Sequence, residues 1–158
     1  MATIEKRAST IVNVSPAAAW SILADEFVDI SRWAGGVLSS KVNPNAGEGP
    51  GGSPVGGRIC DVKGLGLTDE RIVTFEPEQG VIGYSFAAKG LPSFVTAMRN
   101  TWTVVPHGPG GARIDMRIDA TTSGLMGLVG SIPMGRMLGK SAVGLLKDFK
   151  TYAEARAS

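Results

Sequence analysis

The stretch TWTVVPHGPGGARIDMRID at residues 101–119 decides the fold. Along 112–122, apolar residues alternate with arginine and aspartate, and this period of two predicts a β-strand with one apolar and one charged face. The first half of the stretch belongs to a second strand near 94–106, and the Gly- and Pro-rich link at 107–111 predicts a hairpin loop between the two strands. The stretch therefore predicts an antiparallel sheet that is solvated on one side.

Toward the N-terminus, the same period of two predicts five further strands, separated by Gly, Pro or Asn clusters. They lie near 3–14, 37–43, 55–62, 68–76 and 80–89. After the first of these strands, Ser15 is expected to cap a helix that begins at Pro16, and a second short helical turn is expected over 29–33. After Ser123 the helical period returns and predicts a long C-terminal helix.

This order of elements predicts an α+β fold. We expect a seven-stranded curved antiparallel sheet wrapped around the long C-terminal helix, with two short helices after the first strand. The length of 158 residues suits one domain, and no internal repeat or long linker divides the chain. We therefore expect a single domain over residues 1–158.

Composition narrows the classes of function. The chain is 43% hydrophobic and carries 16 basic against 14 acidic residues, with a net charge of +2. The basic residues are scattered, so we expect no nucleic-acid partner. The single cysteine fits a reducing compartment, the N-terminus lacks the apolar segment of a secretion signal, and no apolar run reaches the ~20 residues of a membrane helix. We expect a cytoplasmic monomer or homodimer with no membrane span.

Motifs for nucleotides, metals and nucleophilic catalysis fail on inspection. GEGPGG at 47–52 has the spacing G-x-G-x-x-G, but Pro50 interrupts it and a strand follows where a helix is required. GRMLGKS at 135–141 has three residues between its glycines where a phosphate loop requires four. His107 is the only histidine, and it lies in the predicted hairpin loop, separated from Cys60 by several strands. We expect no cofactor and no metal.

Six strings along the chain carry a resemblance to a known family. They are SPAAAWSILAD at 15–25, ISRWAGGV at 30–37, VGGRICDV at 55–62, LTDERIVTFEPEQGVIGYSF at 67–86, TWTVVPHGPGGARIDMRID at 101–119 and LLKDFKTYAEA at 145–155. In this order they resemble the START-like superfamily, also called SRPBCC, which includes bacterial polyketide cyclases, the birch-pollen allergen group and lipid-transfer domains. The resemblance implies a helix-grip fold with a deep apolar cavity between the sheet and the long helix. It implies no single chemistry, because members bind, carry, cyclise or interact.

Strand alternation and the resemblance together give a set of residues expected to line such a cavity. A sheet face with Tyr, Asn and Trp among apolar neighbours suits a hydrophobic ligand, and methionine adapts to irregular ligands. The position of the tryptophan after the second short helix rests on the resemblance. The set is Trp33, Ile82, Tyr84, Phe86, Met98, Asn100, Trp102, Met116, Ile118, Met126, Met134 and Met137. The alternative is that these residues simply pack as core against the C-terminal helix.

Catalysis has three candidate residues. Glu70 and Arg71 lie on opposite faces of their strand, and the sequence leaves open which of them points inward. An inward Glu70 could act as a general acid or base, an inward Arg71 could anchor an enolate or carboxylate, and Tyr84 could polarise a carbonyl. The chain is thus expected to bind a polyketide-, sterol- or lipid-like molecule. Two alternatives stay open, a polyketide cyclase/dehydratase-type enzyme and an interaction protein with a vestigial cavity.

The 22 glycines concentrate in two segments. Residues 47–57 are expected to form a flexible loop at the rim of the cavity. Glycines at 124–144 run into the long helix, where each costs up to ~1 kcal/mol relative to alanine. This cost suggests either close approach of helix and sheet or a hinged cavity mouth around Pro133.

Overall fold

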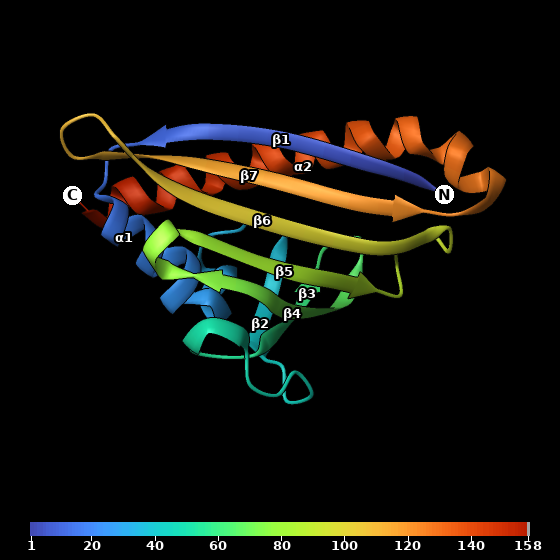
Figure 1. The fold of residues 1–158 in the computed structure, drawn as a ribbon, viewed down its shortest axis with the longest axis horizontal. Coiled ribbons are helices and arrows are strands. Elements are labelled where there is room, and N and C mark those ends of the chain that lie inside the picture. Colours follow the sequence, from blue (N-terminus) through green and yellow to red (C-terminus); the bar gives the residue numbers. More distant parts are fainter. Residues whose placement is uncertain (158) are drawn as a thin grey trace.

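The computed structural model describes residues 1–157 and contains one curved sheet and one long helix (Figure 1). The strands are β1 (Ala2–Val12), β2 (Val37–Val42), β3 (Gly57–Val62), β4 (Gly66–Glu76), β5 (Val81–Ala88), β6 (Val95–His107) and β7 (Gly111–Thr122). The long helix is α2 (Gly124–Ala157). All seven expected strands are present, with ends that differ from the predicted ones by at most two residues.

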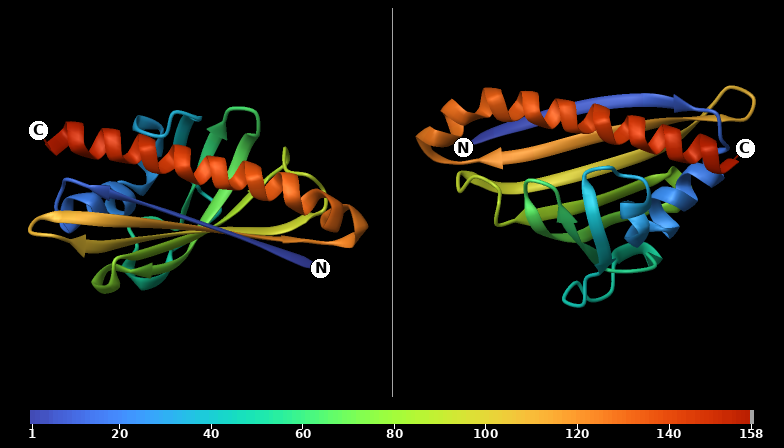
Figure 2. Two further views of the ribbon diagram at one scale, coloured as in Figure 1. Left: turned by 90° about the horizontal axis from the view of Figure 1, so that it is seen from above. Right: turned by 180° about the vertical axis from the view of Figure 1, so that it is seen from behind.

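The strands form a single antiparallel sheet in the order β1-β7-β6-β5-β4-β3-β2. From β2 to β7, consecutive strands are neighbours in the sheet. β1 pairs with β7, so the first and the last strand of the chain lie side by side. The sheet curves, and α2 runs along one of its faces over β1 and β7, as the two views in Figure 2 show. This arrangement confirms the expected helix-grip architecture, and the assignment of residues 1–158 to one domain stays a prediction.

The predicted hairpin of β6 and β7 forms in the expected register. Trp102 lies opposite Met116 and Asn100 lies opposite Ile118, so the apolar residues of both strands share the face toward α2. Met116 is buried, whereas the charged residues between these positions face outward. The alternation at 112–122 therefore reflects one buried and one solvated face.

The segment after β1 is helical but divided. α1 (Pro16–Trp20) starts as predicted, because the Ser15 side chain accepts a hydrogen bond from the backbone N–H of Ala18 at 3.1 Å. A π-helical turn, η1 (Ser21–Asp25), and a 3-10 segment, η2 (Phe27–Arg32), follow it. Two further 3-10 turns, η3 (Pro50–Gly52) and η4 (Pro77–Gln79), lie in loops.

Two glycines near the start of α2 allow close packing. A Cβ atom at Gly127 would lie 3.0 Å from the Thr122 side chain, and one at Gly130 would lie 2.7 Å from the ring of Phe94. α2 is continuous through Pro133, although its first turns bend away from the axis of the remainder (Figure 1). The glycine-rich first half of α2 therefore allows the helix to approach β7 and the loop before β6.

The loop at 47–57 differs from its expected position. A Cβ atom at Gly51 would collide with the backbone carbonyl of Phe75, and one at Gly57 with that of Glu70. The loop is thus packed against β4, and none of its residues lines the cavity described below. Its glycines allow close backbone contact and do not form a rim.

Candidate functional site

A cavity of about 480 Å³ lies between the inner face of the sheet and α2. Most of its lining is apolar, with Phe86, Met98 and Ile118 from the sheet and Leu138 and Leu145 from α2. Its volume falls within the roughly 300–1,000 Å³ typical of small-molecule sites. The fold therefore leaves space for a ligand where a fully packed protein would have core side chains.

Several polar residues line the cavity, among them Lys63, Ser141 and Asp148, and the buried polar part of the wall is centred on the ion pair of Arg58 and Glu70. The two residues lie directly opposite each other on β3 and β4, and both side chains are 4% exposed. The Nε and Nη2 atoms of Arg58 donate to Oε1 of Glu70 at 3.0 and 2.9 Å. Nη1 of Arg58 donates to the backbone carbonyl of Phe27 at 2.6 Å. The pair thus presents a neutral hydrogen-bonded unit to the cavity.

Aromatic rings and a hydroxyl complete the surroundings of this pair. The Arg58 guanidinium lies 3.9 Å from the ring centroid of Phe27 and 4.8 Å from that of Tyr84. The Thr68 hydroxyl donates to Oε2 of Glu70 at 2.8 Å. Burial alone would lower the pKa of the Arg58 guanidinium, but the Glu70 carboxylate reverses this effect, and the net direction is upward. Arg58 is therefore charged at every physiological pH.

Tyr84 and Asn100 form a second polar group beside the pair. The phenol oxygen of Tyr84 accepts hydrogen bonds from Nδ2 of Asn100 and Nε1 of Trp102, both at 3.3 Å. Because both contacts use the oxygen as acceptor, the phenol proton is left to donate. Burial raises the pKa of Tyr84, so the phenol stays protonated at neutral pH. Within residues 1–157, Oδ1 of Asn100 is buried without a hydrogen-bond partner.

The expected ligand-binding residues divide into two groups. Tyr84, Phe86, Met98, Asn100, Ile118 and Met137 line the cavity. The others, Trp33, Ile82, Trp102, Met116, Met126 and Met134, do not. All of these others except Met126 and Trp33 are buried in the core, and Met126 is exposed on the first turn of α2.

An aromatic cluster explains why Trp33, Trp102 and two neighbours of Trp102 on the sheet lie outside the cavity. The ring of Trp33 lies 6.0 Å from that of Trp102 and 5.4 Å from that of Phe149, centroid to centroid. These rings fill the space between sheet and α2 at the end nearest α1. Ile82 and Met116 both lie opposite Trp102 in the register and therefore belong to this filled end.

Of the adjacent catalytic candidates Glu70 and Arg71, only Glu70 points inward. Glu70 faces the cavity, whereas Arg71 faces outward and donates two hydrogen bonds to Asp69, at 3.0 and 3.1 Å. Arg71 therefore cannot contact a ligand in the cavity. Arg58 was not among the residues expected from the sequence, although alternation along VGGRICDV places it on the same strand face as the buried Cys60.

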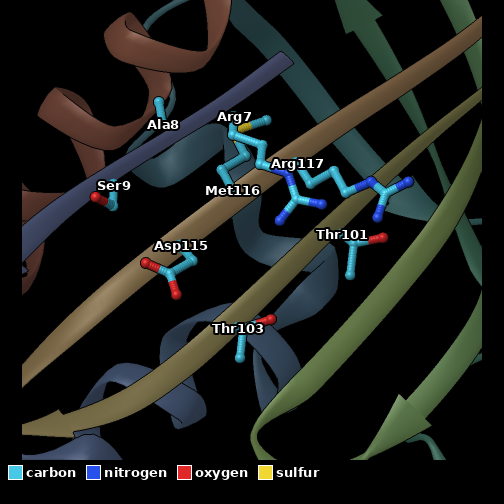
Figure 3. A pocket seen from close by; sticks show the side chains of 8 residues that line it. All are labelled: Arg7, Ala8, Ser9, Thr101, Thr103, Asp115, Met116 and Arg117. Atoms are coloured by element: carbon cyan, nitrogen blue, oxygen red, sulfur yellow. The ribbon is translucent and has the colours of Figure 1, made fainter. Parts of the chain in front are cut away.

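A second hollow, of about 520 Å³, lies on the outer face of the sheet across β1, β7 and β6 (Figure 3). Arg7 and Arg117 project from this face, while Ala8 points the opposite way, toward α2. Arg7 pairs with Glu5 at 2.6 Å, and Arg117 pairs with Glu5 at 3.0 Å and with Asp119 at 2.8 Å. These exposed groups pair with one another, so Arg7 and Arg117 offer no unpaired charge to a ligand in the hollow.

The described part of the chain has no candidate metal site, no cysteine–histidine pair and no helix able to span a membrane. Residues 1–157 contain no group of three His, Cys, Asp or Glu side chains placed to hold a metal ion. His107 is exposed at the β6–β7 hairpin, whereas Cys60 is buried. No helix of the described chain is long and apolar enough to cross a membrane.

Comparisons with known proteins agree with this geometry. The family described as polyketide cyclase / dehydrase and lipid transport matches residues 3–154. No sequence among the curated proteins matches the chain.

Three solved structures of named proteins have the same fold. A Zhui aromatase/cyclase from a Streptomyces species has a TM-score of 0.76 at 15% identity, over 99% of this chain and 97% of that chain. Ara h 8.0201 has a TM-score of 0.73 at 12% identity, over 98% and 99%. A norcoclaurine synthase point mutant from Thalictrum flavum, in complex with a transition-state analogue, has a TM-score of 0.70 at 16% identity, over 99% and 98%.

Proposed function

Because the chain belongs to the polyketide cyclase/dehydrase and lipid transport family of the START-like superfamily, we propose that it binds a hydrophobic small molecule in the cavity between the sheet and α2. The observation that carries the proposal is the cavity itself, whose walls are mostly apolar and include the buried polar group of Arg58, Glu70 and Tyr84. Apolar walls contribute affinity through burial of ligand surface, and a few polar groups fix its orientation.

The polar region indicates the kind of ligand. Arg58 and Glu70 neutralise each other, so neither offers an unpaired charge to a charged ligand. The Tyr84 phenol proton can be donated to a carbonyl or hydroxyl oxygen. We therefore expect a neutral, largely apolar ligand with one oxygen-bearing group, a description that polyketide-, sterol- and lipid-like molecules satisfy.

A second candidate function, that of a cyclase/dehydratase-type enzyme, rests on the same phenol. A protonated Tyr84 that donates to a ligand carbonyl would polarise it, and Glu70 is a carboxylate of the cavity wall that acts electrostatically on Tyr84. Glu70 is held by Arg58 and Thr68, which favours an orienting role for this carboxylate over proton transfer. Binding is therefore the function that the geometry supports better.

A variant that fills the cavity tests the binding proposal. Gly144 lines the cavity, and a Cβ atom there would meet nothing within 4 Å, so Gly144→Phe can place a ring in the cavity. Val143→Phe is the matched control, because Val143 is 61% exposed and does not line the cavity. The measurement is titration with a fluorescent hydrophobic probe, together with native mass spectrometry of protein purified from its host.

We expect the wild-type protein and Val143→Phe to bind the probe equally well, and Gly144→Phe to bind it at least about tenfold more weakly, the equivalent of about 1.4 kcal/mol. Equal binding by all three proteins would place the probe elsewhere and remove the support for the cavity site. Absence of both a co-purified ligand and probe binding would favour the interaction protein with a vestigial cavity.

A further inference from the structure

The first turns of α2 expose an apolar surface that no part of residues 1–157 covers. Its side chains have exposed fractions between 57% and 75%. We call it the α2 apolar patch, and it consists of Leu125, Met126, Leu128, Val129 and Ile132. Exposed apolar surface gathered in one place marks a contact with another protein or with a membrane.

The charges around the patch have one sign. No aspartate or glutamate occurs in residues 120–147. Arg136 and Lys140 follow Val129 and Ile132 at steps of three or four residues, Lys147 lies seven residues, about two turns, after Lys140, and all three are exposed. This spacing places them on the outward face of α2, in line with the patch. Helices that lie in a membrane interface combine an apolar face with basic residues on their polar face, and basic residues near an anionic lipid surface are attracted to it.

The same charges weigh against a second copy as the occupant. A symmetric dimer brings the same patch of both copies together. Arg136 and Lys140 of one copy would then lie near segment 120–147 of the other, and this segment supplies basic residues but no carboxylate to pair with them. A surface of negatively charged headgroups has the opposite effect, because each basic residue near it is attracted.

The patch is also continuous with the mouth of the cavity. Met137 lines the cavity and is 52% exposed, so it joins the cavity wall to the outer surface of α2. Leu91, in the β5–β6 loop, lines the cavity as well, and Phe94 of the same loop packs beside Gly130 of α2. Figure 1 shows this loop and the start of α2 at the same end of the molecule. Exposed Lys63 and Lys89 lie in the neighbouring turns.

We propose that the α2 apolar patch docks on an anionic lipid membrane, with Arg136 and Lys140 at the level of the headgroups and the cavity mouth beside the bilayer. The contact is interfacial, since no helix of residues 1–157 is long and apolar enough to cross a membrane. Docking goes beyond the proposed ligand binding and is independent of the ligand's identity. It would give a hydrophobic ligand a short path between the bilayer and the cavity.

Vesicle co-sedimentation tests the proposal. Vesicles of phosphatidylcholine alone are compared with vesicles of phosphatidylcholine and phosphatidylglycerol, at low and high salt. Val129→Glu places a carboxylate in the patch. Leu38→Glu is the control, because Leu38 is 64% exposed on β2, does not line the cavity and gives the same change in charge. Arg136→Gln removes one basic residue without adding apolar or acidic character.

We expect the wild-type protein and Leu38→Glu to sediment with the phosphatidylglycerol vesicles, and salt to weaken this binding. Val129→Glu should reduce the partition coefficient at least roughly tenfold, and Arg136→Gln about fivefold. Circular dichroism and ligand-probe titration of each variant would establish that the fold and the cavity are intact.

Two outcomes would overturn the proposal. One is that the wild-type protein does not sediment with either kind of vesicle, or that Val129→Glu sediments as well as Leu38→Glu. The other is that the wild-type protein is a dimer by light scattering, that Val129→Glu makes it monomeric, and that no vesicle binding occurs. The second result would assign the patch to contact between copies of the chain and would leave the cavity proposal untouched.

Discussion

Glu70→Gln should destabilise the protein strongly, because it leaves the Arg58 guanidinium buried without a counter-charge. The substitution keeps the size of the side chain, so the change is one of charge and not of packing. Removing one partner of a buried ion pair costs about 3–5 kcal/mol. Arg58 keeps its bond to the Phe27 carbonyl and its contacts with two rings, so we expect the lower end, about 3 kcal/mol. With a urea m-value of about 2 kcal/mol/M, the midpoint of unfolding should fall by about 1.5 M.

Two further variants separate the buried charge from other causes. Asp115→Asn breaks the exposed pair with Arg113, and its midpoint should match that of the wild-type protein. The double variant Arg58→Met/Glu70→Leu removes both buried charges, and we expect it to recover about half of the loss, because the Phe27 carbonyl loses its Arg58 donor and Thr68 loses its bond to Glu70. A cost below about 1 kcal/mol for Glu70→Gln, or a double variant no more stable than Glu70→Gln, would refute the reasoning.

Three other predictions concern single residues. Burial raises the pKa of Cys60 to about 11, whereas the thiol of the unfolded chain ionises near pH 9. The free energy of unfolding should therefore fall by about 2–3 kcal/mol between pH 9 and 11. Urea unfolding at several pH values should show a smaller fall for Cys60→Ala. Gly139→Ala should raise stability by up to about 1 kcal/mol in thermal unfolding, because the added Cβ meets only Lys6, at 3.9 Å. Tyr84→Phe leaves the N–H groups of Asn100 and Trp102 without an acceptor, so the free energy of unfolding in urea should fall by about 1–3 kcal/mol. The same variant should bind a carbonyl-bearing probe more weakly, with a smaller effect on a hydrocarbon probe.

The sequence was sufficient for the fold because the fold depends on local periodicity. Alternation along 112–122 placed one face of β7 in the core, and the Ser15 cap with Pro16 marked the start of α1. These signals involve residues a few positions apart, so they can be recognised in the sequence without knowledge of the tertiary structure. The same reasoning correctly put Tyr84 and Asn100 on the face toward α2.

The extent of the cavity could not be predicted in the same way. Alternation gives the face of a strand but not the point along it where packing stops and the cavity begins. That point depends on Trp33 and Phe149, which lie far apart in the sequence and meet Trp102 only in the folded protein. Trp102 therefore belongs to the core while Asn100, two residues away, lines the cavity.

Arg58 was missed for a different reason, because a charged residue in a strand usually indicates a solvated position. A signal for it did exist. A tight β3–β4 turn centred on Gly64 puts Arg58 directly opposite Glu70, and opposite charges at facing positions of neighbouring strands attract. What the turn could not reveal is that this pair lies on the buried face, with the Phe27 carbonyl and two rings as its remaining partners.

The buried pair also links the stability of the protein to its proposed function. Apolar residues of similar size in place of a buried ion pair are often neutral or stabilising, so stability alone does not account for Arg58 and Glu70. Their position in the cavity wall does, because the pair holds Tyr84 under the Arg58 guanidinium and keeps one part of the cavity polar without adding net charge. An apolar replacement that preserved the fold should therefore change which ligands the cavity accepts, in favour of molecules without an oxygen-bearing group.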